Sequence, residues 1–496
     1  MLLINKTILE KLLEKKDQIV LYLISTLYIY NIKDIVFPSN FQQDDISELR
    51  VINFLDFHCV VGQGDNHPLW TYLIWFSSKI SLFRLEVFIS TLNIILLFLS
   101  LILLSKTFIK LFGNTLALLL LILFVSSPSV LTYSVSLKQY MIELFYSSFC
   151  IFSILYKENN NFQLLSSRKF IVVSVLSIVG SLVNASILLI ILLYLIFINK
   201  IKWSYFLKFS FFVLPIYPYF LRIYRKLSRE SYSEYWRDFF ISSAIPTEFF
   251  EKFISIFNLL FKSFFGYSYF DQLVYVLLLG LLVSFFIYEK NAEFPKFVLI
   301  TFFILNIFKL YPLGAGRTDI ILFPFFLVLF GFLLKKLFPY TKMAIPKIFT
   351  FVFLIYLLFS VDAFYKIETM SPLINDLNES KDISSSIVVS PEQAPSFEYY
   401  SKEIFGQKIE KNKECNLKTV NLKNYYVIGK VEVNPKYFTE QITKATKENS
   451  VYVIGIEIPG TRGRFRDIED YLYEKSFKLV FSKTYEKGIY LNYYNK

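Results

Sequence analysis

Long apolar runs fill most of the first 365 residues and constrain the fold more than any other feature of the sequence. A hydrocarbon core about 30 Å thick takes roughly 20 helical residues to cross. About eleven runs near that length recur, at residues 18–36, 86–105, 112–127, 140–156, 170–183, 185–199, 204–222, 271–288, 296–311, 318–334 and 347–364. The stretch 170–199 can also be a single helix, but Gly180 and Asn184 favour two. The sequence therefore predicts an all-α polytopic membrane domain over residues 1–365.

Composition and charge agree with a membrane protein and suggest its orientation. The chain is 55% hydrophobic, with a mean hydropathy of +0.48 and a net charge of +12. Most lysines and arginines between the runs fall on the side that also holds the N-terminus, which predicts a cytoplasmic N-terminus. The predicted outer loop 223–270 departs from this bias because it carries Arg225, Lys226, Arg229 and Arg237, but long loops translocate largely regardless of charge. We expect a multi-pass plasma (inner) membrane protein. Its positive charge anchors the inner face, and we expect no binding to nucleic acid.

The first run and the rare residue types narrow the possibilities further. No small-residue cleavage site follows residues 18–36, so we expect a retained anchor rather than a signal peptide. The chain has 3 Cys and 2 His, without the spacing of a metal centre. No phosphate-binding glycine loop or nucleophile elbow is present. We therefore expect that no cofactor is required, although two adjacent carboxylates can hold a divalent metal through oxygen ligands.

The polar residues 366–496 have a different pattern. Strand-like runs lie at Ser386–Ser390, Tyr425–Gly429, Val451–Ile458, Lys478–Phe481 and Gly488–Tyr493. Helical patterns lie between them, at Ser396–Phe405 and Thr439–Glu448, so we predict a small α/β domain. An odd number of preceding helices makes this domain extracytoplasmic. Its most basic run, Thr461–Arg466, is either a solvated loop or a contact for an anionic acceptor.

An acidic segment follows the first predicted helix and forms the start of an outer loop over residues 37–85. Asp44 and Asp45 are adjacent there, and Asp65 and His67 follow about twenty residues later. Charged groups close to hydrocarbon are costly and tend to mark function. Asp44 is the candidate general base, and Asp45 is its partner or an acceptor-positioning group. Asp65 and His67 are candidates for the substrate site.

Cations occur at two other predicted outer boundaries. Lys138 and Tyr140 follow the turn Ser126-Ser127-Pro128, and Arg317 ends the turn Tyr311-Pro312-Leu313-Gly314-Ala315-Gly316-Arg317. A carboxylate base opposite Lys and Arg suits chemistry on a phosphate-linked leaving group, because the cations offset charge on the departing phosphate. We predict that Lys138 and Arg317 bind that phosphate and that Tyr140 lies in the same site.

Four separated segments resemble the C-superfamily of integral-membrane glycosyltransferases (GT-C type), in its protein-mannosyltransferase-like and aminoarabinose-transferase-like branch. Asp44-Asp45 resembles the acidic pair of the family's first outer loop, and Asn66–Tyr72 is similar to its His-Pro-Pro-Leu-Tyr-Tyr stretch. The segment from Ser127 to Tyr140 and the turn from Tyr311 to Arg317 resemble two further family patterns. This chain has one proline after His67 instead of two, and Asp45 stands where Glu is commoner.

The resemblance implies a sugar donor linked to a lipid phosphate, a catalytic Asp in the first outer loop and an extracytoplasmic acceptor. The expected function is transfer of a hexose or pentose from a polyprenyl-phosphate donor to an envelope glycan, lipid or protein. An oligosaccharide polymerase or ligase is the nearest enzymatic alternative. A transporter or flippase for a lipid-linked or anionic precursor is the main alternative outside enzymes, but transporters tend to place charges near the midplane and to repeat their halves. A non-catalytic membrane scaffold is a further alternative.

Each candidate residue also has a purely structural interpretation. Asp44 can cap a helix over residues 44–56, and Asp65 can be a solvated loop residue. His67 can simply precede the proline that follows it. Lys138 can extend its charge to the membrane interface, with Glu143 one turn later as a neutralising partner. Arg317 can anchor the start of a helix or pair with Asp319.

Overall fold

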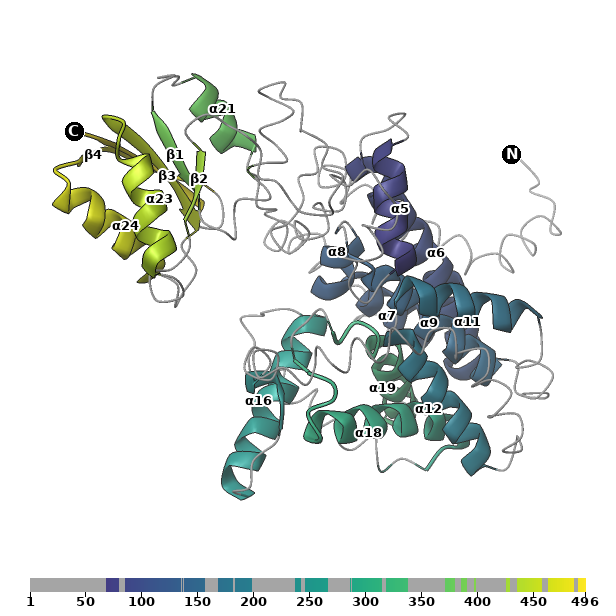
Figure 1. The fold of residues 1–496 in the computed structure, drawn as a ribbon. Coiled ribbons are helices and arrows are strands. Elements are labelled where there is room, and N and C mark those ends of the chain that lie inside the picture. The colour runs from purple at the N-terminus through teal and green to yellow at the C-terminus, as the bar shows by residue number, and fades with distance from the viewer. Residues whose placement is uncertain are drawn as a thin grey trace, which may run out of the picture. The chain divides into compact units, whose positions relative to one another are not determined.

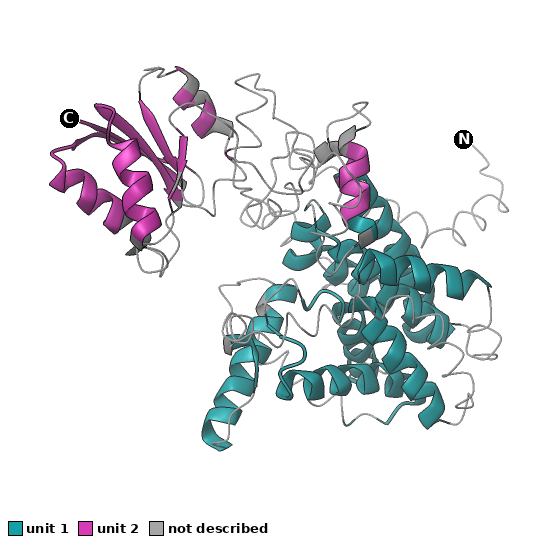
Figure 2. Ribbon diagram, viewed as in Figure 1, with its two compact units in different colours: residues 1–34, 65–70, 90–364 teal, residues 35–64, 71–89, 365–496 magenta. Residues whose placement is uncertain are grey.

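The computed structural model of the chain describes two compact units (Figure 2). The described residues are 68–79, 85–134, 136, 138–156, 168–181, 183–198, 237–241, 246–265, 286, 288–314, 318–337, 371–379, 385–389, 397, 425–428, 435–456, 463–485 and 489–496. Of these, residues 68–70 and 90–337 belong to unit 1, and residues 71–79, 85–89 and 371–496 belong to unit 2. The boundary predicted after residue 365 lies outside the described residues and stays a prediction.

Unit 1 is helical (Figure 1). Its helices are α6 (Leu85–Phe112), α7 (Asn114–Val125), α8 (Pro128–Ser134), α9 (Tyr140–Ile151), α11 (Arg168–Gly180), α12 (Val183–Phe197), α16 (Pro246–Phe265), α18 (Glu293–Ile307) and α19 (Phe323–Leu337). Helix α5 (Pro68–Lys79) begins in unit 1 and continues in unit 2, and residues 85–89 of α6 also belong to unit 2. A π-helical turn, Phe152–Tyr156, continues α9, and short 3₁₀ turns lie at Arg237–Phe239 and Lys290–Ala292. Helix α19 is almost wholly buried and packs against α7, α9 and α18. Close packing there depends on Gly331, because a Cβ at this position would lie 2.6 Å from the ring of Phe112.

Seven of the predicted apolar runs coincide with observed helices, α6, α7, α9, α11, α12, α18 and α19. The preference for two helices over residues 170–199 is confirmed, since α11 ends at Gly180 and α12 begins at Val183. The prediction that the last of the seven begins at residue 318 was wrong: residues 318–322 form a turn, and α19 begins at Phe323. The runs 18–36, 204–222 and 347–364, and most of 271–288, lie outside the described residues.

Three described helices before residue 365 were not predicted from the sequence. Helices α5 and α16 fall inside predicted outer loops, and α8 begins at the last residue of the predicted turn Ser126-Ser127-Pro128. The helices Ser371–Glu379 and Gly463–Glu474 were not predicted either. Helix α16 buries one side, which includes Ile256, Phe257, Leu260 and Phe264, whereas Phe250 is exposed. A spacing of three or four residues marks such a one-sided helix. A search for uninterrupted apolar runs does not detect that pattern.

Only part of the described helical unit meets the length and hydropathy of a membrane span. Phe88–Phe112 qualifies by itself, and α7 with α8 qualifies as a pair bent by 57°. The segments Tyr140–Tyr156 and Val183–Phe197 are apolar but shorter, so the predicted number of spans is not confirmed among the described residues. Exposed apolar side chains nevertheless form rows along single helices, such as Ile95, Leu99 and Ile102 on α6. Rows of this kind are expected of helices in contact with lipid rather than water.

Residues 371–496 contain a five-stranded sheet in the order β2-β1-β3-β5-β4 (Figure 1). The strands are β1 (Ser386–Val389), β2 (Tyr425–Val427), β3 (Ser450–Ile456), β4 (Lys478–Thr484) and β5 (Ile489–Asn495). Strands β2, β1 and β3 are parallel, while β5 pairs antiparallel with β3 and β4 pairs antiparallel with β5. All five predicted strands are confirmed. The predicted helix Thr439–Glu448 is observed as α23 (Pro435–Ala445), whereas all of Ser396–Phe405 except Phe397 lies outside the described residues.

The sheet has a hydrophobic core on each face. Val388 of β1 packs with Ile442 of α23 and Leu472 of α24 (Gly463–Glu474). The next residue, Val389, joins the opposite cluster with Leu373 of α21 (Ser371–Glu379). Successive side chains of a strand point to opposite faces. The apolar run Ile387–Val389 of β1 therefore follows from helices covering both faces.

A polar cluster joins α21 to the edge of the sheet. Asp376 of α21 pairs with Lys483 of β4 and also accepts a hydrogen bond of 2.5 Å from the hydroxyl of Tyr485. The hydrogen bond from Lys483 has the larger effect, and together with the one from Tyr485 it lowers the pKa of the Asp376 carboxyl below its usual value. The cluster fixes the short helix to the last hairpin.

Candidate active site

The predicted site residues are only partly described. Lys138 and Tyr140 lie in described segments of unit 1, whereas Asp44, Asp45, Asp65, His67 and Arg317 lie outside the described residues. Their convergence in one cavity therefore stays a prediction. What the structure does show is how the segments that carry Lys138 and precede Arg317 are held.

The segment with Lys138 lies between two helices and is anchored to a third. Helix α8 begins at Pro128, which suits the first position of a helix because proline lacks the backbone N–H. After α8 ends, the side chain of Asn93 on α6 donates a hydrogen bond of 2.6 Å to the carbonyl of Ser136. The Ser136 hydroxyl in turn accepts a hydrogen bond of 3.1 Å from the backbone N–H of Lys138. Lys138 is thereby held half-buried just before α9.

Tyr140, which is predicted to lie in the same site as Lys138 and Arg317, begins α9. Its ring lies 4.5 Å from that of Tyr133 on α8, measured between centroids, with the planes tilted by 58°. Aromatic pairs at this separation stabilise one another beyond the area they bury. Tyr140 therefore has a packing role between α8 and α9, and its place in a substrate site remains a proposal.

Glu143 lies one turn into α9 and is fully enclosed by protein. The hydroxyl of Ser181, between α11 and α12, donates a hydrogen bond of 2.6 Å to its carboxylate, and the side chain of Gln139 is a second partner. A buried carboxylate needs such donors to offset its desolvation. Glu143 therefore connects the Lys138 segment to the break between α11 and α12, a role that its sequence position alone did not predict.

Asn306, near the end of α18, holds the start of the turn that leads to Arg317. Its side-chain N–H groups donate to the carbonyls of Phe239, at 2.7 Å, and Tyr311, at 2.9 Å. Its side-chain oxygen accepts a 2.9 Å hydrogen bond from the backbone N–H of Ile241. The backbone of Leu313 adds a bond of 3.1 Å to the carbonyl of Phe239. The turn is therefore joined to residues far away in the sequence.

The same turn is closed on itself by side chains. The hydroxyl of Tyr311 donates to the carbonyl of Thr318 at 2.5 Å, and the hydroxyl of Thr318 donates to the carbonyl of Pro312 at 3.0 Å. The carboxylate of Asp319, which is completely buried, accepts a 3.0 Å hydrogen bond from the backbone N–H of Gly314. These bonds lie on both sides of residues 315–317. They also explain why α19 begins later than predicted.

Gly314 fits this turn for two reasons. Its φ of +87° is in the left-handed region, and a Cβ there would lie 3.0 Å from the Cβ of Leu259 on α16. Left-handed backbone costs an L-residue roughly 1–2 kcal/mol.

We expect Gly314→Ala to lower the unfolding temperature of the purified protein. The substitution carries a backbone cost of about 1–2 kcal/mol and also forces a contact with α16. Thermal unfolding in one detergent, followed by circular dichroism, measures the shift. An unchanged unfolding temperature would show that the turn does not pack against α16 as described.

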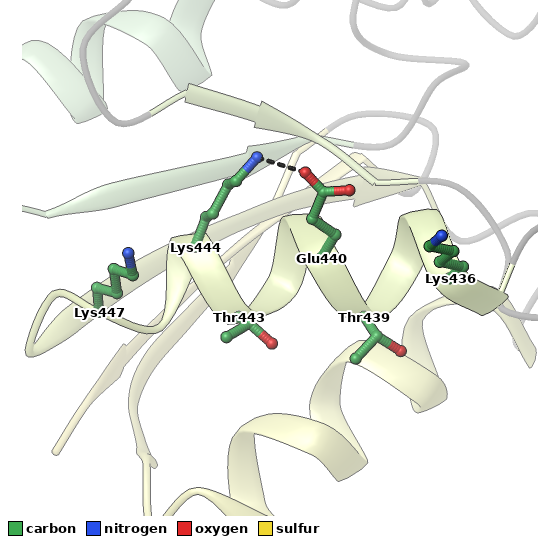
Figure 3. Close-up of a pocket in the computed structure, with 6 residues that line it drawn as sticks. All are labelled: Lys436, Thr439, Glu440, Thr443, Lys444 and Lys447. Atoms are coloured by element: carbon green, nitrogen blue, oxygen red, sulfur yellow. Dashed lines mark hydrogen bonds and ion pairs between the residues drawn. The ribbon is translucent and has the colours of Figure 1, made fainter.

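A shallow groove of about 660 Å³ lies along α23 in unit 2 (Figure 3). Lys436, Thr439, Glu440, Thr443, Lys444 and Lys447 line it. Figure 3 shows Lys444 and Glu440 one turn apart and joined by an ion pair of 2.7 Å. An exposed pair at this spacing contributes little to stability. We interpret the groove as the solvated face of an amphipathic helix.

The structure also bears on the predicted basic run Thr461–Arg466 and on possible metal sites. The residues Gly463–Arg466 of the basic run form the first turn of α24, so the loop interpretation of these residues was wrong. Among the described residues, no group of three or more His, Cys, Asp or Glu is arranged to hold a metal ion. Asp44 and Asp45, the pair considered for a metal, are not among them.

Solved structures share the fold of this protein over nearly the whole chain. No protein-family model matches the chain, and no curated protein matches it. The crystal structure of ArnT from Cupriavidus metallidurans bound to undecaprenyl phosphate matches with a TM-score of 0.53 and 10% identity, covering 95% of this chain and 97% of that one. Its apo state matches with a TM-score of 0.50 and 11% identity, covering 94% and 97%.

A third match is the oligosaccharyltransferase of Archaeoglobus fulgidus in complex with Zn and sulfate, with a TM-score of 0.48, 12% identity and coverage of 95% and 72%. The chain has the fold of ArnT, an aminoarabinose transferase. The resemblance drawn from four short sequence segments is thus confirmed at the level of fold.

Proposed function

We propose that this chain is a membrane glycosyltransferase that moves a sugar from a polyprenyl-phosphate donor to an extracytoplasmic acceptor. The observation that carries the proposal is the fold shared with ArnT, which was crystallised with undecaprenyl phosphate, over 95% of this chain. The apolar rows on the helices of unit 1 support a location in the membrane. A hexose and a pentose both fit this proposal.

The proposed chemistry begins at the acidic pair. The carboxylate of Asp44 takes the proton from an acceptor hydroxyl, and the acceptor oxygen bonds to the anomeric carbon of the sugar. The bond between that carbon and the phosphate oxygen breaks, and its electron pair leaves with the polyprenyl phosphate. Asp45 positions the acceptor or replaces Asp44 as the base. Their adjacency in the first outer loop supports this assignment.

The departing phosphate is proposed to lie between Lys138 and Arg317. Arg presents a planar fork of donors to phosphate oxygens, and Lys presents a compact charge. The anchoring of the Lys138 segment to α6 supports a fixed position for that cation. Asp65, His67 and Tyr140 are proposed to line the sugar or acceptor part of the site. A divalent metal at Asp44 and Asp45 is not required, because the two cations already neutralise the phosphate.

The proposed orientation places the N-terminus in the cytoplasm and residues 366–496 outside the inner membrane. This C-terminal part then contacts the acceptor, which is an envelope glycan, a lipid or a protein. Glycan profiling of a deletion strain would identify the acceptor. Loss of a sugar from one envelope polymer or protein is the expected result, whereas an unchanged envelope would contradict the proposal.

Truncation after Ile367 is expected to abolish transfer to the natural acceptor while donor hydrolysis is retained. The reason is that the proposed reacting groups all precede residue 365, whereas the described residues 371–496 have cores of their own. Retained hydrolysis also serves as the control that the truncated protein is folded. Full acceptor transfer by the truncated chain would contradict the role of the C-terminal part. A reporter fused to the C-terminus that is active only in the cytoplasm would contradict the orientation.

A further inference from the structure

We propose that the outer edge of the sheet in unit 2 docks on the anionic surface of the lipid bilayer. The docking surface, the edge patch, consists of Tyr473 in the last turn of α24 and of Leu479, Val480 and Phe481 in β4. Figure 1 shows β4 as the last strand on one side of the sheet. The inference needs a membrane-bound chain and does not depend on the proposed sugar transfer.

Strand β4 is exposed along its whole length. A strand that packs one face on a core alternates between buried and exposed residues, whereas all seven residues of β4 are exposed. The side chain of Val480 is 58% exposed, and its neighbours Leu479 and Phe481 are exposed as well. Single apolar residues on a surface are ordinary, but a contiguous group of them marks a site of interaction.

The four residues of the edge patch form one continuous group. Leu479 pairs with Tyr494 of β5, and the ring of Tyr494 lies 6.0 Å from that of Tyr473, measured between centroids. Val480 and Phe481 continue the strand from Leu479, and the pairing with β5 shifts its register between Leu479 and Phe481. The patch therefore extends from the end of α24 along the edge strand.

Hydrogen bonds hold this edge in place. The hydroxyl of Ser482 donates to the side-chain oxygen of Asn492 on β5 at 2.6 Å. The side-chain N–H of Asn492 in turn donates to the carboxylate of Glu469 on α24 at 3.2 Å. The exposed apolar residues therefore belong to a strand that is fixed to the sheet and to a helix, and the folded domain presents them to its surroundings.

Lysines border the edge patch. Lys475 and Lys478 precede the apolar residues of β4, Lys483 follows them, and all three lysines are exposed. Two acids lie beside them, Glu474 in the sequence and Asp376 in space, and Asp376 pairs with Lys483. Apolar and aromatic side chains bordered by lysines suit an anionic bilayer, because the apolar groups enter the headgroup boundary while the lysines contact the headgroups.

The position of unit 2 in the chain makes the bilayer the expected partner. The last predicted span ends at residue 364, and α21 begins at Ser371. Seven residues extend at most about 25 Å, so the prediction keeps Ser371 within that distance of the membrane. An added peptide strand is the alternative partner for an open edge. The shift of register at Val480 and the edge lysines argue against it, because bulges and edge lysines both hinder strand addition.

The test identifies what touches the edge patch in the full-length protein. The photoreactive amino acid p-benzoylphenylalanine replaces Val480, and the protein is reconstituted in vesicles of phosphatidylglycerol and phosphatidylcholine. Mass spectrometry after illumination measures the yield of lipid adducts. Tyr437 of α23, an exposed aromatic residue outside the patch, receives the same replacement as the matched control. We expect the yield at position 480 to exceed that at position 437 severalfold, and to fall in vesicles of phosphatidylcholine alone.

Charge reversal tests the role of the lysines. Lys475→Glu combined with Lys478→Glu should lower the adduct yield at position 480 about tenfold, because each lysine near an anionic surface adds to the attraction. Lys436→Glu combined with Lys447→Glu makes the same change of charge in the groove along α23 and should leave the yield unchanged. The comparison of the two vesicle compositions keeps the test decisive even if a charge-reversed protein fails to fold.

Three results would overturn the inference. Equal adduct yields at positions 480 and 437 would show that the edge patch has no special contact with lipid. A yield at position 480 that is the same in vesicles of phosphatidylcholine alone would remove the anionic surface as the partner. Adducts to protein in place of lipid, including a dimer of this chain, would show that the edge receives a polypeptide. The assay contains no sugar donor or acceptor, so its outcome is independent of the proposed transferase activity.

Discussion

Replacing Asp44 and Asp45 together by asparagine is expected to lower sugar transfer about 10²–10⁴-fold, the range typical of a lost general base. Asparagine is nearly the same size but does not take up a proton at neutral pH. The acceptor hydroxyl would therefore have to attack without losing its proton to the enzyme. The variant should insert in the membrane at normal levels and still bind the lipid donor, because the predicted donor contacts lie in other segments.

The two single variants then identify the base. The residue whose replacement alone reproduces most of the loss is the base, and the other residue positions the acceptor. Asp56→Asn is the matched control, since Asp56 belongs to the same acidic segment but has no proposed role. Initial rates of transfer measure the effect. Full activity in both single variants and in the double variant would remove the acidic pair from the mechanism.

Lys138→Ala and Arg317→Ala are each expected to raise KM for the lipid donor about tenfold or more. A hydrogen bond to a charged group contributes about 1.5–3 kcal/mol, and a change of about 1.4 kcal/mol corresponds to a factor of ten. Arg317→Lys should restore only part of the binding, because lysine lacks the planar fork that matches phosphate oxygens. Donor titrations at saturating acceptor concentration measure these values.

The matched control removes an exposed lysine from the opposite predicted side of the membrane. Lys106, near the end of α6, is exposed, and its replacement by alanine should leave KM unchanged. If neither Lys138→Ala nor Arg317→Ala changes KM, the phosphate is bound elsewhere. Arg225 and Arg229 in the long predicted outer loop would then be the next candidates.

The elements with strong local periodicity could be predicted from the sequence. The five strands of residues 371–496 were found because β-rich runs alternate with polar turns, and the break near Gly180 was found because Gly and Asn interrupt an apolar run. Helices α5 and α16 were missed because their buried residues lie on one side only. The order of the strands could not be predicted, since the pairing of β1 with β2 and β3 joins residues far apart in the sequence.

The sequence suggested the candidate site as a set of residue types, and the arrangement of these residues stays a prediction. Acidic and basic residues at expected membrane boundaries suggested phosphate chemistry before any fold was known. The supporting contacts could not be predicted from the sequence, because Asn93 contacts Ser136 and Asn306 contacts Phe239 only after the helices have packed. The late start of α19 has the same origin, since the side chain of Asp319 favours the turn over another helical residue.

The protein is proposed to consume a lipid-linked sugar, and a mass balance on the donor tests this proposal. The purified full-length protein would be placed in vesicles with a labelled polyprenyl-phosphate sugar fraction from the producing cells, together with an envelope extract as acceptor. We expect free polyprenyl phosphate to appear in step with sugar on the acceptor, and the variant lacking both the Asp44 and Asp45 carboxylates to release almost none. Recovery of the intact donor in the opposite leaflet, with no free polyprenyl phosphate, would contradict the account and identify a transporter.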